Sequence, residues 1–254
     1  MCFMNIIKYK KQNNGSYKIY LENGQILTLY EEVILKYELL LKKYIDLDSI
    51  LTIEKENQKW DVYYCALKQL NRKAFSAEDL KIYLLRKEYP LSLVEDIINK
   101  LVEQGYLNDL AFTRSYIHQQ MITSLKGPLK IKQELYDKKI SSDIIESEID
   151  VFSVEEQKER IKKIIQKKIN ENHSRGGYVL KQKIVQDLKL LGYDYYVFSS
   201  LIDKYSFSNN QEIAKKEYNK LYRKYSRKYE GDKLDRIIRE KLYLKGLVYN
   251  EKEE

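Results

Sequence analysis

The chain of 254 residues is long enough for one or two domains with ordinary hydrophobic cores. Apolar residues make up 43% of it, which excludes wholesale disorder, and only 9 Gly and 2 Pro argue against a turn-rich all-β protein. The formal net charge of +8 indicates an anionic partner or surface.

The first residues and the two cysteines carry no targeting or metal-binding signal. Residues 1–11 hold too few apolar side chains for a signal peptide, and no apolar stretch of the sequence reaches the about 18 residues that cross a membrane. Cys2 and Cys65 match no metal or redox spacing and are too few for a disulfide framework. We expect a cytoplasmic protein that has no membrane association.

Residues 1–56 are expected to form a small module of a β-hairpin and a helix. In "SYKIYLENGQILTLY" (16–30), apolar residues alternate on each side of Asn23-Gly24, and this dipeptide favours a type I′ turn because both residues accept positive φ. The next run, "EEVILKYELLLKKY" (31–44), predicts one helix with acidic residues at its start and lysines at its end. Its 8 basic and 8 acidic residues leave the module neutral.

From about Trp60 onward the pattern is helical and repeats every 50 residues or so. Four leucines mark the repeat at steps of 51, 53 and 54: Leu84, Leu135, Leu188 and Leu242. An apolar residue lies four positions before each of them, and another lies five positions after: Leu80 and Tyr89, Ile131 and Ile140, Ile184 and Tyr193, Ile238 and Leu247. The position four after each leucine is expected to end the helix with positive φ, which suits Gly192 and Gly246 better than Glu88 and Lys139.

The fold class expected from this pattern is mainly α, with tandem three-helix repeats in an elongated array, because one repeat cannot bury its apolar face alone. The expected boundaries are 57–109, 110–155, 156–209 and 210–254, with the third helix missing from the last repeat. The first helices of the repeats are expected at Trp60–Lys73, Leu110–Thr123, Glu156–Ile169 and Glu212–Lys228. A single helical domain with accidental periodicity is the alternative that spacing alone leaves open.

Residues that start and stop helices separate the repeats. Ser92 with Glu95 forms a capping-box pattern, and Gly105 suits the end of the helix that follows. Asn108 or Asp109 is expected to cap the next helix.

Two further helix starts are visible. Ser153 with Glu156 repeats the capping-box pattern at the third repeat. Gly127 and Pro128 suit the start of a helix, because proline at the first helical position loses no donor that the helix needs. These residues orient helices and cannot carry out a reaction, so the function is expected on the surface that the helices present.

Three segments resemble the RecX family of regulatory proteins, which bind RecA: "SAEDLKIYLLRK", "VEDIINKLVEQGYLNDLAF" and "KGPLKIKQELYDKKI". One departure is Lys139, where the family usually has glycine. Long members of the family carry an N-terminal extension, which is consistent with residues 1–56. The resemblance implies a regulator of DNA repair, homologous recombination and the SOS response that lies along the groove of the RecA–DNA filament. It implies obstruction of strand exchange, ATPase and coprotease activities, and promotion of filament loss.

No constellation of residues indicates catalysis. His118 and His173 are the only histidines, and neither belongs to an HExxH-type pair. "HSRGGY" (173–178) is glycine-rich but lacks the GxxxxGK[ST] frame of a phosphate loop. We therefore expect a protein that is not an enzyme and that needs no cofactor or metal. We also expect a monomer.

Two basic helices are the strongest candidates for binding. In "KERIKKIIQKK" (158–168), Ile161, Ile164 and Ile165 form the buried stripe. In "KKEYNKLYRKYSRK" (215–228), Tyr218 and Leu221 follow core spacing, and Tyr225 continues it. The cations expected to lie outside these stripes and to contact RecA or DNA are Lys158, Arg160, Lys162, Lys163, Lys167, Lys216, Lys220, Arg223 and Arg227.

Other interpretations of the basic helices stay open. Lysine-rich faces are often only solvated, and Tyr222 or Tyr229 could stack on bases or pack against the protein. Weak electrostatic binding to single- and double-stranded DNA is expected alongside the RecA filament. A free-standing DNA-binding protein or transcriptional regulator built from helix-turn-helix-like units is one alternative function, although no helix is rich in base-reading residues. A helical adaptor for another protein is a third.

Overall fold

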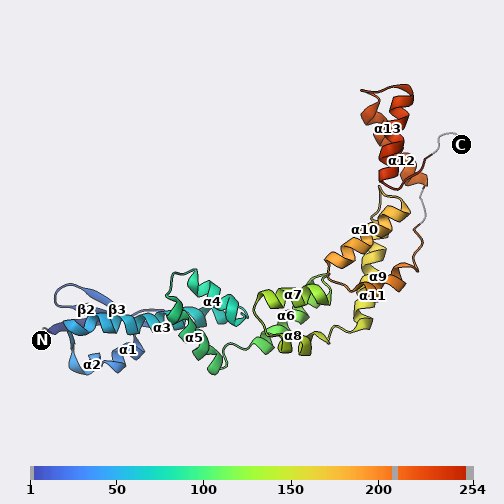
Figure 1. The fold of residues 1–254 in the computed structure, drawn as a ribbon. Helices are drawn as coiled ribbons and strands as arrows, with labels where there is room; N and C mark the ends of the chain where they lie inside the picture. The colour runs from blue at the N-terminus through green and yellow to red at the C-terminus, as the bar shows by residue number, and fades with distance from the viewer. Residues whose placement is uncertain (1–2, 208–210, 250–254) are drawn as a thin grey trace. The chain divides into compact units, whose positions relative to one another are not determined.

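The computed structural model describes residues 3–207 and 211–249, in which a small β-sheet precedes a series of α-helices (Figure 1). The fold class is therefore mainly α, as the sequence predicts. The chain divides into two compact units, Met1–Phe112 and Thr113–Glu254, which are described separately.

The N-terminal sheet has four antiparallel strands in the order β3-β2-β1-β4. The strands are β1 (Phe3–Lys11), β2 (Ser16–Leu21), β3 (Ile26–Tyr30) and β4 (Tyr44–Asp46). The predicted hairpin is confirmed as β2 and β3, whereas β1 and β4 were not predicted. One face of the sheet is buried through Ile19, Leu21, Leu27 and Leu29.

The turn between β2 and β3 differs from the predicted type I′ turn. Gly24 has a φ of +84°, but Asn23 is not among the residues with positive φ. The amide of Gly24 donates to the carbonyl of Leu21 at 3.0 Å, and the amide of Leu21 donates to the carbonyl of Gln25 at 2.9 Å. This is a three-residue loop in which a type I turn is followed by a left-handed glycine. The side chain of Asn23 accepts a hydrogen bond from the amide of Gln25 at 2.9 Å, which is the Asx turn that asparagine often forms.

The single helix predicted over residues 31–44 is wrong. It is broken into α1 (Glu31–Lys36) and α2 (Leu39–Lys42), with Glu38 at a φ of +54° between them. The break lets both Ile34 and Leu39 reach the core, since positions five apart lie on different faces of a continuous helix.

Helix α3 (Ile50–Leu70) follows the short 3₁₀ turn η1 (Leu47–Ser49) and is common to the sheet module and the first repeat. It begins ten residues before the predicted start at Trp60. Its first half contributes Ile53 to the core beneath the sheet. Its second half contributes Val62 and Ala66 to the next core. The residue boundary expected at 56/57 therefore lies inside a helix.

The first repeat consists of α3, α4 (Ala77–Leu85) and α5 (Leu91–Glu103). The predicted capping role of Ser92 is wrong, because α5 begins directly after Pro90 and Ser92 lies within its first turn. Gly105, with a φ of +75°, ends this segment as predicted. Asn108 caps the next helix by accepting from the amide of Ala111 at 2.9 Å.

The following helices continue the pattern of three per repeat. They are α6 (Asp109–Thr123), α7 (Pro128–Asp137) and α8 (Ser142–Ile149), then α9 (Val154–Asn170), α10 (Gly177–Leu190) and α11 (Tyr195–Ile202), then α12 (Gln211–Tyr225) and α13 (Gly231–Leu244). Within the described residues, no helix follows α13. The helix starts predicted at Gly127-Pro128 and at Ser153 are confirmed. The exact boundaries of the repeats stay predictions.

The four marker leucines are confirmed as core residues, each at most 2% exposed. The residue four positions after each marker leucine has a positive φ: 65° at Glu88, 60° at Lys139, 85° at Gly192 and 69° at Gly246. In the last three repeats, the residue five positions after the leucine donates its amide hydrogen to the carbonyl of that leucine. This hydrogen bond is the one that closes a Schellman motif at the end of a helix. The repeat in the sequence is thus a repeat of helix ends as well as of core positions.

Backbone hydrogen bonds connect successive repeats in the second unit. The amide of Gly127, at the start of α7, donates to the carbonyl of Leu191, at the end of α10, across 2.7 Å. The amide of Gly176, at the start of α10, donates in the same way to the carbonyl of Lys245 after α13 across 2.7 Å. A β-carbon on Gly246 would lie 2.6 Å from the Val179 side chain. Because Gly246 also has a positive φ, glycine is favoured where the end of α13 approaches the Val179 side chain of α10.

Candidate interface for nucleic acid and a protein partner

Helix α12 presents one apolar and one cationic face. Ala214 and Leu221 are buried against α13, with Tyr218 and Tyr225 packed beside them, as the predicted stripe requires. The opposite face carries all four predicted cations, which are exposed: Lys216, Lys220, Arg223 and Arg227. Together with Asn219 and Lys224, these four side chains line one shallow depression of about 560 Å³.

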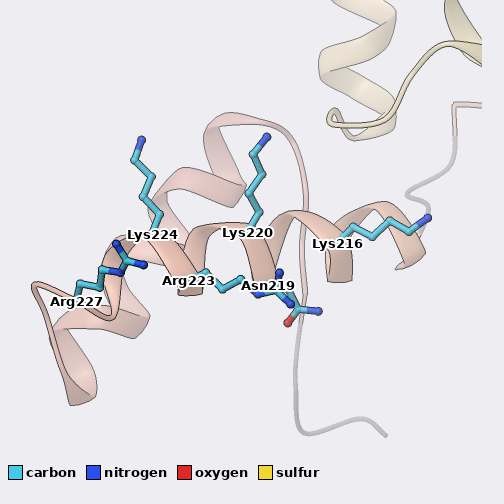
Figure 2. Close-up of a pocket in the computed structure, with 6 residues that line it drawn as sticks. All are labelled: Lys216, Asn219, Lys220, Arg223, Lys224 and Arg227. Atoms are coloured by element: carbon cyan, nitrogen blue, oxygen red, sulfur yellow. The ribbon is translucent and has the colours of Figure 1, made fainter.

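The cations of α12 spread along the whole helix. Figure 2 shows Lys220 and Lys224 extending to one side of the axis, and Arg223 and Asn219 to the other. Arg227 lies just beyond the last helical residue, Tyr225. Lys224 was not singled out from the sequence, although its position four residues after Lys220 places it on the same helix face.

These cations are mostly without acidic partners. In the described part of the chain, Lys216, Arg223, Lys224 and Arg227 form no ion pair. Lys220 lies 3.8 Å from the carboxylate of Glu217. Glu217 is only 5% exposed and is also paired with Lys245, so it neutralises little of the outer face. The face is therefore open to an external anion.

The two tyrosines considered for base stacking differ in environment. Tyr222 is 45% exposed and stacks on Tyr218 at a centroid distance of 6.1 Å. Tyr229 is half-buried, lies beside Tyr225 and is covered by the ammonium of Lys233. Of the two, Tyr222 is the more exposed and is the better candidate for stacking on a base.

Helix α9 carries a more neutralised set of cations. Ile161, Ile164 and Ile165 are buried as predicted. Three lysines of this helix pair with nearby carboxylates: the half-buried Lys158 with Glu155 at 4.0 Å, and the exposed Lys162 and Lys167 with Glu159 at 2.7 Å and Glu171 at 3.9 Å. Lys168 pairs with Asp187 of α10 at 2.7 Å. Among the described residues Lys163 forms no ion pair.

The ion pairs of α9 are exchangeable. The hydrogen bond from Lys162 to Glu159 raises the pKa of Lys162 and lowers the pKa of Glu159. Because both side chains are exposed, such a pair contributes little to stability and can give way to a phosphate.

The predicted outward position of Arg160 is wrong. Its guanidinium donates to the backbone carbonyls of Met121 and Ser124, at the end of α6 and just beyond it. It also lies 5.2 Å from the ring centre of Phe152. Arginine is long enough to reach back to an adjacent helix end, where carbonyl oxygens lack amide partners. Arg160 therefore joins the second and third repeats.

The described residues contain no group of three or more His, Cys, Asp or Glu side chains that could hold a metal ion. Within those same residues, none of the helices combines the length and the apolar character needed to cross a membrane. That α9 and α12 contribute to one common surface stays a prediction.

Comparison with known proteins identifies similar chains. Residues 108–147 match the family model described as RecX, second three-helix domain. The regulatory protein RecX of Halalkalibacterium halodurans is 31% identical over 254 residues, which cover 97% of this chain and 96% of that relative. The regulatory protein RecX of Streptococcus agalactiae serotype Ia is 29% identical over 98% of this chain and 96% of its own. A crystal structure of a regulatory protein RecX matches with a TM-score of 0.66 at 28% identity, over 79% of this chain and 99% of that one.

Proposed function

Because the chain belongs to the RecX family of regulatory proteins, we propose that it binds the RecA–DNA filament along its groove and inhibits recombinase, ATPase and coprotease activities. The observation that carries the proposal is the similarity to regulatory proteins named RecX over nearly the full length of the chain. The protein would act in the cytoplasm as a monomer, by occupying the groove and disfavouring the active filament, which requires differential binding and no cofactor.

The structure supports this proposal in two ways. Backbone hydrogen bonds between successive repeats, such as the one from Gly127 to Leu191, suit a chain that must span several subunits of a filament. Four cations that line the α12 depression, namely Lys216, Arg223, Lys224 and Arg227, form no ion pair within the described residues and can face phosphates or acidic protein surface. In the proposal, α12 and the exposed lysines of α9 supply the contacts, and Arg160 supplies none.

Cosedimentation separates this function from simple DNA binding. The protein is mixed with preassembled RecA filaments on single-stranded DNA, with RecA alone and with bare DNA at the same salt concentration. We expect tighter binding to the filament than to either component. Equal binding to the filament and to bare DNA would contradict the proposal.

The second candidate function is free-standing DNA binding, and the row of exposed cations that lines the α12 depression is the observation that favours it. Phosphate contacts alone produce non-specific, strongly salt-dependent affinity. In that case the protein would affect RecA only at concentrations that cover the DNA. A requirement for RecA in the cosedimentation experiment distinguishes the two functions.

A further inference from the structure

The N-terminal sheet has one apolar face and one cationic face. Side chains alternate across a strand, so the neighbours of the buried Ile19, Leu21, Leu27 and Leu29 point away from the core. The strand register places these outward residues in two rows across β1, β2 and β3. One row is Lys10, Lys18 and Thr28, and the other is Lys8, Tyr20 and Ile26. Tyr20 is half-buried, and the other five residues are exposed.

The lysines of this face repel one another and are not neutralised. Lys10 lies directly opposite Lys18 in the ladder, a like-charge pair that destabilises a sheet. In the described residues, Lys8, Lys10 and Lys18 form no ion pair. Such an arrangement costs stability, and an anionic ligand would compensate for it.

The acidic residues of the module lie elsewhere in its sequence. Between residues 3 and 30 the only carboxylate is Glu22, and it accepts hydrogen bonds from the backbone and side-chain nitrogens of Asn5. The other acids follow from Glu31 onward. A module that is neutral as a whole therefore concentrates its positive charge on the strands.

We propose that this face binds single-stranded nucleic acid, with the lysines along the phosphates and a base on the ring of Tyr20. Lys10, Lys11, Lys18 and Tyr20, with residues 12–14, border a shallow depression of about 430 Å³. A basic groove beside an aromatic ring on an open sheet is the combination that holds single strands without sequence preference. An acidic protein surface would use the lysines but not the ring, so the observations favour nucleic acid.

This site extends beyond the RecA-directed function proposed above. The test measures affinity for a labelled oligothymidine strand longer than the about 4–16 nucleotides that such platforms cover. The test variant is Lys8→Gln/Lys10→Gln/Lys18→Gln in the full chain. The matched control is Lys36→Gln/Lys42→Gln/Lys43→Gln, which removes the same charge from the helical side of the module.

The test variant is expected to bind the strand about tenfold more weakly than the control. The slope of its log affinity against log salt concentration should be smaller by up to about 2, which is about 0.7 for each lost phosphate contact. Tyr20→Leu should weaken single-strand binding about fivefold or more and leave duplex binding unchanged. Thermal melts should show that the lysine variant is at least as stable as wild type. Equal affinity of the test and control variants would overturn the proposal and leave an acidic protein as the partner of this face. Inhibition of RecA ATPase is measured separately and does not decide this outcome.

Discussion

The amide of Gly127 donates to the carbonyl of Leu191 across 2.7 Å, which places the start of α7, the middle helix of one repeat, against the end of α10, the middle helix of the next. A β-carbon on Gly127 would lie 2.5 Å from the carbonyl oxygen of Gly192. A β-carbon on Gly192 would clash with the backbone nitrogen of Lys130. The two glycines thus permit a backbone contact that any other residue would obstruct.

Substituting Gly192 with alanine should destabilise the second unit. The left-handed φ of 85° and the clash at Lys130 add up to a loss of about 2–4 kcal/mol in the free energy of unfolding. Urea denaturation followed by circular dichroism measures it. Lys139→Gly is the matched control, because Lys139 has the same backbone conformation. That variant should gain up to about 1 kcal/mol. A loss in Gly192→Ala no larger than the about 1–2 kcal/mol that the left-handed conformation alone costs would show that the close approach of the repeats is unimportant.

Arg160→Ala should lower stability before it affects binding. The substitution leaves the carbonyls of Met121 and Ser124 without their charged donor, at a cost of about 1.5–3 kcal/mol. Lys163→Ala, on the exposed face of the same helix, should change stability by less than about 0.5 kcal/mol. Thermal melts of the two variants at equal salt provide the comparison. A fully stable Arg160→Ala protein that has lost filament binding would return Arg160 to the interface.

Reversing the charge of α12 should weaken filament and DNA binding without unfolding the protein. In the variant, Lys216, Lys220, Arg223 and Arg227 become Glu, and each exposed change costs about 0.5 kcal/mol or less. If phosphates are the target, the slope of the salt dependence on single strands falls by about 0.7 for each phosphate that the protein no longer neutralises. If acidic RecA surface is the target, binding to the filament falls more than binding to bare DNA.

The matched control reverses four exposed cations on the neighbouring helix α13: Lys233, Arg236, Arg239 and Lys241. Both variants have the same net charge, so a difference between them locates the interface. The affinities for filament and for DNA are measured as a function of salt concentration. If they are the same for the two variants, the exposed face of α12 is only solvated and binds neither partner.

Alkaline pH should destabilise the first unit. The hydrogen bond to Glu32, followed by burial, raises the pKa of Tyr64 to about 12. Burial, and then hydrogen bonds to Asp61, raise the pKa of both Tyr30 and Tyr89. An unfolded tyrosine titrates near pH 10, so the stability that these protons supply is complete below pH 10 and is lost as the pH rises toward 12.

Urea denaturation at a series of pH values tests the tyrosine prediction. Wild type should lose stability steadily between about pH 10 and 12, and Tyr64→Phe should lose less over the same interval. Tyr196, which is 89% exposed, provides the control. Tyr196→Phe should follow wild type. A Tyr64→Phe protein whose decline matches that of wild type would show that the Tyr64 proton supplies none of this stability.

The helical repeats could be predicted because their signals are local. Each repeat signal lies within a single helix and its end. It consists of the marker leucine, the apolar residue four positions earlier and the left-handed residue four positions later. Strand β1 was missed because a register shift between Ile6 and Lys8 interrupts its alternation. The position of Arg160 was missed because helix periodicity gives the direction of the Cα–Cβ bond. It does not show where the far end of a long side chain lies. The contact of Gly127 with Leu191 joins residues of different repeats, which no local pattern specifies.

The most direct test of the central claim is a titration of the single-strand-dependent ATPase of the cognate RecA with this protein. A regulator that lies along the filament groove should lower the ATPase at protein concentrations well below that of RecA, because one such chain would cover more than one RecA subunit. Filaments should shorten over the same range. Unchanged ATPase and unchanged filament length at equimolar protein would contradict the account.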